Sequence, residues 1–266
     1  MKHIVDSHCH IYPEKIADKA VKGIGDFYGL PMSLDGRCDT LIAEGRKAGV
    51  SRHLIFSVAT RPSQTRSINE FIASEVRAHP DIFTGLGTLH PDSDDIAGDI
   101  AHLKSLGLRG VKLHPDVQGF KIDDYRCLAI YEKCEGELPI LFHTGDSRYD
   151  LSNPNRMEPI LEIFTGLTVI GAHFGGYSVW EEASRRLCGH PNFYVDSSSS
   201  LFALSAETAT EIIRRYGADK VLFATDFPMW SPAEEIKRFD ALSLTEAERE
   251  RILWKNANEL FSLELN

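Results

Sequence analysis

Val5-Asp6-Ser7-His8-Cys9-His10 is a short run near the start of the chain that ends in two histidines one residue apart. In an extended strand, successive side chains point to opposite faces, so His8 and His10 share one face while Ser7 and Cys9 turn away. One strand can therefore present two imidazoles to one metal ion. Neighbouring histidines also occur on solvated strand edges, so the weight of this pair depends on the rest of the chain.

Other histidines and a late aspartate stand in similar places. Each closes or nearly closes an apolar run that is bounded by Pro or Gly. A lone histidine beside such a run is more often a core or surface residue than a ligand, but several at matching strand ends are hard to obtain by accident. These residues are His114, His143, His173 and Asp226.

The order of the elements predicts a barrel. Short β-rich runs alternate with stretches in which apolar residues recur at three and four, a pattern typical of βα units around a parallel sheet. Eight such units in about 250 residues fit a closed (β/α)8 barrel better than an open doubly wound sheet. We expect strands at 3–11, 53–59, 83–89, 110–114, 140–143, 168–172, 193–196 and 221–225, and helices at 68–78, 95–106, 124–134, 158–164, 180–187 and 206–216.

The end of the chain departs from the barrel pattern. Residues 245–254 and 256–263 predict a closing helical pair, and Thr245 with Glu248 three positions on predicts a capping box. No linker or internal repeat interrupts the chain. We therefore expect an α/β fold, a single-domain (β/α)8 TIM barrel with a C-terminal helical extension over residues 1–266.

Composition indicates an enzyme-sized globular protein. The 266 residues are 42% hydrophobic and 26% charged, enough to bury a large core. The formal charge of −10 argues against a nucleic-acid surface, and charges interrupt every apolar run before the roughly 20 residues needed to cross a bilayer. Five cysteines form no CxxC pair, and no signal peptide is recognised, so reduced thiols in the cytoplasm are expected. The expected partner is a small-molecule substrate, with a homodimer left open.

In a barrel, the carboxyl ends of all strands open onto the same mouth. The predicted first strand ends with His8 and His10, the fourth with Lys112 and His114, and the fifth, sixth and eighth bring His143, His173 and Asp226. Imidazoles with one carboxylate suit zinc or a similar divalent ion, with a position left open to water. A structural metal site or a nonenzymatic ligand-binding module is the alternative. Structural zinc is usually enclosed by Cys and His at short spacings, so an enzyme is favoured.

Five motifs surround these residues: Asp6-Ser7-His8-Cys9-His10, Gly110-Val111-Lys112-Leu113-His114-Pro115, Phe142-His143-Thr144-Gly145, Gly171-Ala172-His173-Phe174-Gly175-Gly176 and Phe223-Ala224-Thr225-Asp226-Phe227-Pro228. Together they resemble the amidohydrolase superfamily, in its amidohydrolase-related branch of metal-dependent barrel enzymes. The resemblance implies that His8, His10, His143 and Asp226 bind the metal. It also implies that Asp226 and His173 are catalytic, with His173 either polarising the substrate or holding a second metal.

The resemblance leaves the number of metals open at Lys112. In two-metal members, a lysine at the end of the fourth strand is carboxylated and bridges both ions. The local pattern is closer to the one-metal branch, so we expect one Zn²⁺, with a second metal if Lys112 is modified. His114 shares a face with Lys112, where it either contacts the substrate, supports a ligand or is structural.

The metal and Asp226 predict the chemistry. A divalent ion can lower the pKa of bound water to about 7, and Asp226 can take the proton as the resulting hydroxide attacks. His173 and the metal then share the developing oxyanion. We expect hydrolysis of an amide, lactone or ester bond of a small molecule. The alternative is nonoxidative decarboxylation of an unsaturated or aromatic acid.

Side chains beside the predicted mouth allow two interpretations each. Asp196 either supports a ligand or caps a helix, and Arg148 either clamps a substrate carboxylate or is a solvated charge. Trp230 either walls the pocket or packs. Residues 29–37, in the first connection, are either a lid over the barrel mouth or a passive surface excursion.

Overall fold

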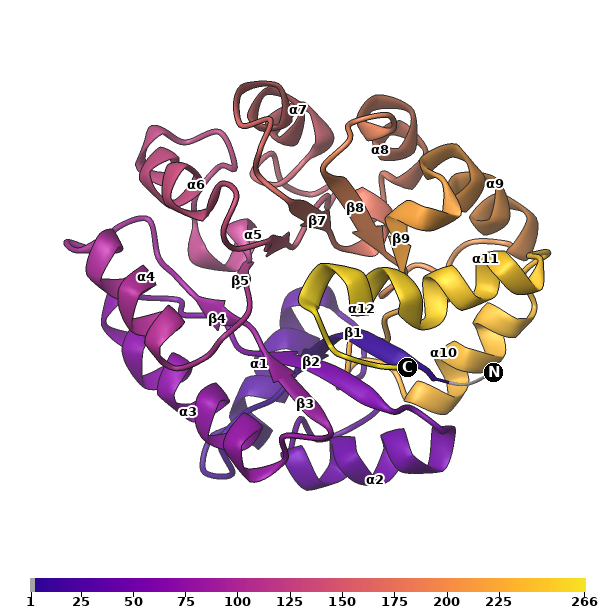
Figure 1. Cartoon of the computed structure of the whole chain (residues 1–266), viewed down its shortest axis with the longest axis horizontal. Coiled ribbons are helices and arrows are strands. Elements are labelled where there is room, and N and C mark those ends of the chain that lie inside the picture. Colours follow the sequence, from indigo (N-terminus) through magenta and orange to yellow (C-terminus); the bar gives the residue numbers. More distant parts are fainter. Residues whose placement is uncertain (1–2) are drawn as a thin grey trace.

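The computed structural model describes residues 3–266 and shows parallel strands surrounded by helices (Figure 1). Every strand pairing is parallel, in the order β1-β2-β3 and β4-β5-β6-β7-β8-β9. The strands are β1 (Val5–His10), β2 (Arg52–Phe56), β3 (Phe83–Gly85), β4 (Gly87–Thr88), β5 (Val111–Leu113), β6 (Ile140–Phe142), β7 (Val169–Gly171), β8 (Phe193–Asp196) and β9 (Val221–Leu222).

Backbone hydrogen bonds join the two sheets on both sides. Between β3 and β4, the N–H of Leu86 donates to the β2 carbonyl of Ile55 at 3.0 Å, so the expected strand at 83–89 runs from one sheet into the other. On the other side, the N–H of Ser7 donates to Phe223 at 2.9 Å and that of His10 to Phe227 at 2.7 Å. The segment after β9 therefore lies against β1, as an eight-stranded barrel requires.

Helices pack around the strands and agree with most of the expected ranges. The first connection carries two helices that the sequence pattern did not identify, α1 and α2. The helix expected at 158–164 starts earlier, because Pro154 takes the first helical position, where its missing N–H costs nothing. No described helix is both long and apolar enough to span a membrane. The helices are α1 (Ala17–Tyr28), α2 (Cys38–Ala48), α3 (Thr65–Ala78), α4 (Ile96–Ser105), α5 (Pro115–Gln118), α6 (Leu128–Cys134), α7 (Pro154–Ile163), α8 (Trp180–Leu187), α9 (Ala206–Tyr216), α10 (Pro232–Asp240), α11 (Glu246–Glu250) and α12 (Asn256–Phe261).

The C-terminal helices close one end of the barrel. The predicted capping box at Thr245 is present and starts α11. A π-helical turn, Arg251–Lys255, continues it into α12, and there the Ile252 carbonyl accepts a hydrogen bond from the N–H of Phe223 at 2.9 Å. Phe261 is buried in the same apolar cluster as the inward-facing strand residues. In Figure 1, α12 crosses the barrel in yellow.

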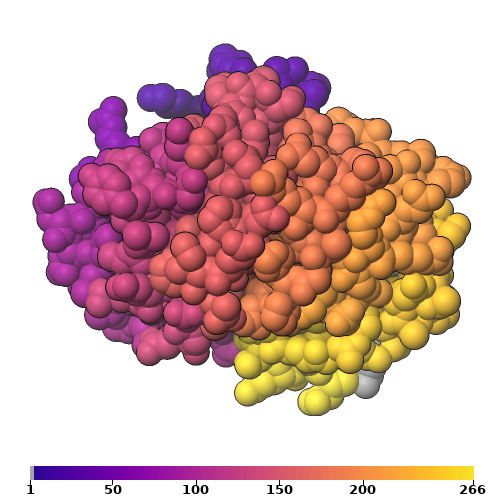
Figure 2. All heavy atoms as spheres, turned by 90° about the horizontal axis from the view of Figure 1, so that it is seen from above, coloured from indigo at the N-terminus to yellow at the C-terminus, as the bar shows by residue number. Residues whose placement is uncertain are grey.

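The functional side chains lie at the other end. In Figure 2, indigo residues from the N-terminal part of the chain lie at the upper edge of the molecule, and the yellow C-terminal residues lie at its lower edge. A larger apolar cluster fills the layer between strands and outer helices. The barrel is thus sealed where its strands begin, which leaves the carboxyl ends of the strands for the site.

Candidate metal centre

His8, His10 and Asp226 bring three ligand atoms together at the mouth. His8 Nε2 lies 3.2 Å from His10 Nε2 and 3.3 Å from Asp226 Oδ1, and His10 Nε2 lies 3.8 Å from the same oxygen. Two ligand atoms that share a zinc-sized ion at about 2.1 Å are separated by roughly 3.0–3.5 Å. The two spacings from His8 Nε2 match this range, and the spacing of 3.8 Å between His10 and Asp226 lies slightly beyond it, so the donor set fits one divalent cation after a small closure.

Asp226 is held in a backbone conformation that few residues adopt. Its φ is 61°, in the left-handed region that is costly for a side chain with a Cβ. Ser199 Oγ donates to Asp226 Oδ2 at 2.5 Å, and Trp230 Nε1 donates to Ser199 Oγ at 3.0 Å. Trp230 thus acts on the aspartate through Ser199, and the carboxylate keeps Oδ1 toward the histidines.

Asp196 orients His8 from behind. Its Oδ2 accepts a hydrogen bond from His8 Nδ1 at 2.8 Å, and neither side chain is more than 1% exposed. A proton on Nδ1 leaves Nε2 with its lone pair toward His10 and Asp226, the tautomer that metal ligation requires. Of the two sequence interpretations of Asp196, the structure agrees with support of a ligand.

His173 is fixed at its Nδ1 atom in the same way. Nδ1 lies 2.9 Å from the carbonyl oxygen of Ser198, which can only accept, so Nε2 faces the site. Nε2 lies 3.0 Å from His143 Nδ1. The φ of His173 is 58°, a second strained position at the mouth.

His143 stands with a second group of side chains. Its ring stacks on His114 with 4.0 Å between centroids and 4° between planes, and its Nε2 lies 3.3 Å from Asp116 Oδ2. Burial raises the pKa of Asp116 to about 6. The structure therefore groups His8, His10 and Asp226 directly, while His143 joins them through His173. Asp116 was missed in the sequence, although it follows His114-Pro115 directly.

Lys112 points into the same cluster. It is fully buried, and its Nζ lies 3.2 Å from His8 Nε2 and 5.1 Å from the centre of the Phe56 ring. Burial lowers the pKa of this ammonium group to about 7, against the opposing pull of Asp196 and Asp226. The face shared by Lys112 and His114 is thus the inner face of the barrel mouth, as the alternation of β5 predicts.

The electrostatic environment favours neutral imidazoles. Burial is the largest cause that lowers the pKa of four site histidines well below its ordinary value, and nearby cationic groups lower it further. Only a neutral imidazole has a free lone pair for a cation. The four residues are His8, His10, His114 and His143.

Helix α1 covers the site with Tyr28, which sequence reasoning missed. The Tyr28 hydroxyl lies 3.1 Å from His114 Nε2 and 3.4 Å from His143 Nδ1. Arg148 anchors the end of α1 by donating to the carbonyl of Phe27 at 2.8 Å, while it pairs with Asp146 at 2.7 Å. Arg148 thus holds the C-terminal end of α1 in place over the site. The cavity left inside measures about 30 Å³.

The sequence as a whole matches the model of one protein family, described as amidohydrolase, over residues 5–263. The chain belongs to the amidohydrolase family. A curated relative of this amidohydrolase is the gamma-resorcylate decarboxylase of Polaromonas sp. strain JS666. The two sequences are 26% identical over an alignment 262 residues long. The match covers 77% of this chain and 78% of the relative.

Solved structures confirm the barrel. A TIM-barrel protein from Bordetella bronchiseptica has a TM-score of 0.77 at 21% identity and covers 98% of this chain and 99% of that one. A dihydroxybenzoic acid decarboxylase from Polaromonas sp. JS666, with manganese and the inhibitor 2-nitroresorcinol bound, has a TM-score of 0.74 at 18% identity and covers 100% of this chain and 98% of that one. A candidate 2-pyrone-4,6-dicarboxylic acid hydrolase from Pseudomonas putida has a TM-score of 0.70 at 19% identity, with 100% of both chains covered. At these identities the likeness shows the fold.

Proposed function

We propose that this amidohydrolase is a metal-dependent, nonoxidative decarboxylase of an unsaturated or aromatic carboxylic acid. The observation that carries the proposal is the convergence of His8, His10 and Asp226 in a chain that is 26% identical to a gamma-resorcylate decarboxylase over 77% of its length. The sequence alone ranks hydrolysis of an amide, lactone or ester first. The activity named for the relative favours the decarboxylation alternative.

The metal ligands proposed are those of the resemblance, His8, His10, His143 and Asp226. Their nitrogen and oxygen donors suit several borderline divalent ions, and manganese in the Polaromonas decarboxylase supports a divalent ion without singling out zinc. When bound, such an ion supplies positive charge that draws an acidic substrate into the site and stabilises negative charge on it.

Decarboxylation requires one proton to reach the carbon that loses CO₂. Asp226 carries that proton in our proposal: protonation of the ring carbon is followed by cleavage of its bond to the carboxylate, and the bond's electron pair returns to the ring. Ser199 steadies the second oxygen of Asp226 throughout. The net reaction consumes one carboxylate anion and one proton, and it yields CO₂ and the ring compound with a hydrogen in place of the carboxylate.

His173 is the second catalytic residue proposed. Its Nδ1 proton is donated to the Ser198 carbonyl, so Nε2, which lies 3.0 Å from His143 Nδ1, is the atom that accepts a hydrogen bond from a substrate hydroxyl. Tyr28 and His114 line the same inner cavity, where a hydroxyl donor and a neutral imidazole can fix the orientation of the substrate ring. Buried donors placed this way lower the cost of reorganisation during the reaction.

The test is CO₂ release by purified, metal-loaded protein from 2,6-dihydroxybenzoate and 5-carboxyvanillate, beside a panel of lactones and amides. In D₂O, we expect one deuteron on the carbon that lost the carboxylate. Asp226→Asn should keep the fold and lower turnover at least about a hundredfold, because the proton carrier is lost. Retained turnover after complete metal removal, near-normal rates in this variant, or lactone hydrolysis without CO₂ would each refute the proposal.

A further inference from the structure

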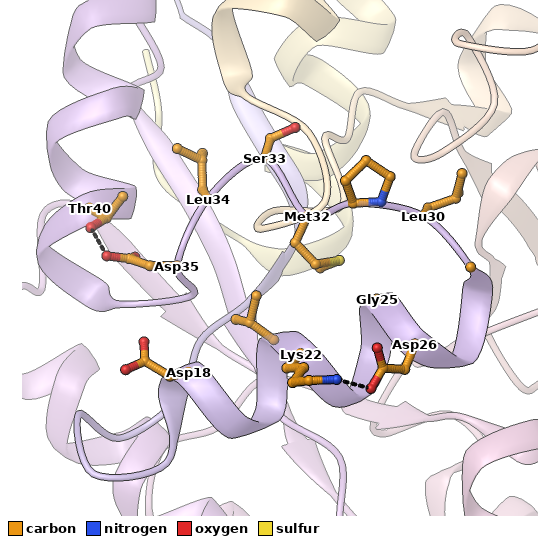
Figure 3. Close-up of a pocket in the computed structure, with 13 residues that line it drawn as sticks. Asp18, Lys22, Gly25, Asp26, Leu30, Met32, Ser33, Leu34, Asp35 and Thr40 are labelled. Atoms are coloured by element: carbon orange, nitrogen blue, oxygen red, sulfur yellow. Dashed lines mark hydrogen bonds and ion pairs between the residues drawn. The ribbon is translucent and has the colours of Figure 1, made fainter.

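A large open cleft lies beside the metal centre. It is formed between α1 and the chain from Gly29 to Asp35, and its volume is about 950 Å³ (Figure 3). Small-molecule sites typically measure roughly 300–1,000 Å³, whereas the inner cavity of about 30 Å³ accommodates little more than one water. An aromatic acid therefore needs more room than the inner cavity offers, and this cleft is the adjoining space.

Met32 separates the two spaces. It lines both the cleft and the inner cavity, where it stands beside Ile24 and Tyr28. In Figure 3, its side chain extends from the 29–35 segment toward Gly25 of α1. A methionine has three rotatable side-chain bonds and no branch, so it can turn aside at low cost. Rotation of one side chain would thus join the cleft to the metal centre.

Gly25 makes the close packing at this wall feasible. A Cβ at this position would stand 3.0 Å from the Leu30 carbonyl oxygen and 3.3 Å from Met32 Cγ. Because Gly25 has no side chain, Met32 can pack directly against the backbone of α1. The wall that Met32 forms depends on this fit and not on a hydrogen bond of its own.

The segment that carries Met32 is tied to the loop that carries Asp226. The N–H of Ser33 donates to the carbonyl of Met229 at 3.2 Å, and that of Leu34 donates to Pro228 at 3.0 Å. Both Pro228 and Met229 line the inner cavity. The cleft and the metal centre therefore share a wall built from two loops joined by backbone hydrogen bonds.

The charges along the cleft restrict what it can hold. Its lining includes three carboxylates, and each of them is paired. Lys22 pairs with Asp26 at 2.5 Å, and Arg37, beside the lining, pairs with Asp18 at 2.9 Å and with Asp35 at 3.2 Å. Between them lies an apolar floor that includes Leu30 and Met32. Three carboxylates against two cations that are already paired leave net negative charge, so a second carboxylate on the substrate would be repelled, whereas an apolar or positively charged group would not.

We propose that this cleft is the outer part of the substrate site and that Met32 is the gate between its outer and inner parts. The inner part holds the carboxylate end of the acid, and the ring occupies the space that Met32 leaves when it turns aside. The outer part holds a neutral or cationic substituent on the opposite side of the ring. This inference rests on the proposed function, because the acid is taken to be the occupant of the metal centre.

Access to the metal provides a test that does not depend on turnover. The zinc-loaded protein is mixed with the flat aromatic chelator 4-(2-pyridylazo)resorcinol, and formation of the coloured zinc complex is followed at several chelator concentrations. Met32→Ala should speed the chelator-dependent rate several-fold, and Met32→Trp should slow it. Leu30→Ala is the matched control, since Leu30 lines the cleft but not the inner cavity, and its rate should remain that of the wild type.

The substituent class is tested by calorimetric binding of 2,6-dihydroxybenzoate derivatives that carry a methoxyl, an aminomethyl or a carboxylate at ring position 4. We expect the carboxylate to bind roughly three- to tenfold more weakly than the other two. Asp26→Asn should narrow this difference.

Rates that do not respond to either Met32 variant would overturn the gate, and preferred binding of the dicarboxylate would overturn the substituent class. Faster zinc release in Met32→Ala, in a protein that decarboxylates no acid, would uphold the gate and refute the proposed decarboxylase. Binding of the acids without any effect of the position 4 substituent would overturn the outer site while leaving the decarboxylase intact.

Discussion

The substitution Asp196→Asn isolates the part that a buried carboxylate plays behind the metal centre. Asp196 is fully buried and accepts hydrogen bonds on both oxygens. Oδ2 accepts from His8 Nδ1 at 2.8 Å, and Oδ1 accepts from the backbone N–H groups of His173 and Ser198, both at 3.0 Å. The Ser198 hydroxyl is a further donor to Oδ1. Four donors thus converge on the two oxygens of one carboxylate, which leaves no acceptor position for water.

An asparagine of the same shape cannot serve these four donors. If its NH₂ group faces His8, two donors meet, and His8 must move its proton to Nε2, the atom that should bind the metal. If the NH₂ group faces the backbone, it meets the N–H groups of His173 and Ser198 instead. Loss of a hydrogen bond to a buried charge costs about 1.5–3 kcal/mol, and substitution of a residue that orients a metal ligand typically lowers metal affinity about 10- to 100-fold.

The assay is competition between the variant and a chelator of known affinity, with the fold monitored by circular dichroism and thermal unfolding. We expect Asp196→Asn to remain folded and to bind the ion about 10- to 100-fold more weakly than the wild type. Ser198→Ala is the control, because it removes the neutral hydroxyl that lies beside Asp196 and 3.1 Å from His8 Nδ1, and it leaves the carboxylate on His8. Wild-type metal affinity in a folded Asp196→Asn protein would refute the argument that the tautomer of His8 is set by Asp196.

Three further predictions concern the centre and the core. Lys112→Met should keep one ion per chain in metal analysis, since a one-metal site does not need this lysine; loss of all metal would favour a carboxylated bridge. Burial raises the pKa of Glu235 from 4.5 to about 7, so the folded state binds the extra proton and the free energy of unfolding falls as pH rises from 4.5 to 7. Glu235→Gln should therefore add up to about 3 kcal/mol at pH 8 and little at pH 4 in urea denaturation; the reverse order would contradict this. Phe261→Ala removes a buried α12 side chain from the closed end of the barrel. It should lower the free energy of unfolding by about 3–5 kcal/mol and leave the metal affinity of the folded protein unchanged.

The fold could be predicted because its signals are local and repeated. Short apolar runs mark strands that are covered on both faces, and the capping box at Thr245 marks a helix start by side-chain chemistry alone. Boundaries were harder to predict. The run at 83–89 reads as one strand, yet residues 83–85 are paired with β2 and residues 87–88 with β5. Pairing partners depend on the closure of the barrel, which no local pattern records.

Part of the site could be predicted from the sequence, because it too depends on a local pattern. His8 and His10 lie on one strand, so their common face follows from the alternation of side chains, and the structure places their Nε2 atoms 3.2 Å apart. Tyr28 has no such signal. It reaches His114 only because α1 folds back over the mouth and is fastened there by Arg148, a contact between residues 121 positions apart. Side chains delivered by a covering helix depend on tertiary packing and cannot be placed by periodicity.

Stability and strain occupy opposite ends of the barrel. At the closed end, α12 fills the interior with apolar side chains such as Phe261, which stabilise without any special backbone geometry. At the open end, His173 and Asp226 both have positive φ, and Lys112 is buried without a carboxylate in hydrogen-bonding contact among the described residues. Each of these features costs free energy in the folded chain. A cation held among the imidazoles and Asp226 would offset part of that cost, because it binds the folded site and not the separated ligands of the unfolded chain. The metal should therefore raise the melting temperature of the wild type more than that of Asp226→Asn, since the variant keeps the strained backbone but loses a charged ligand.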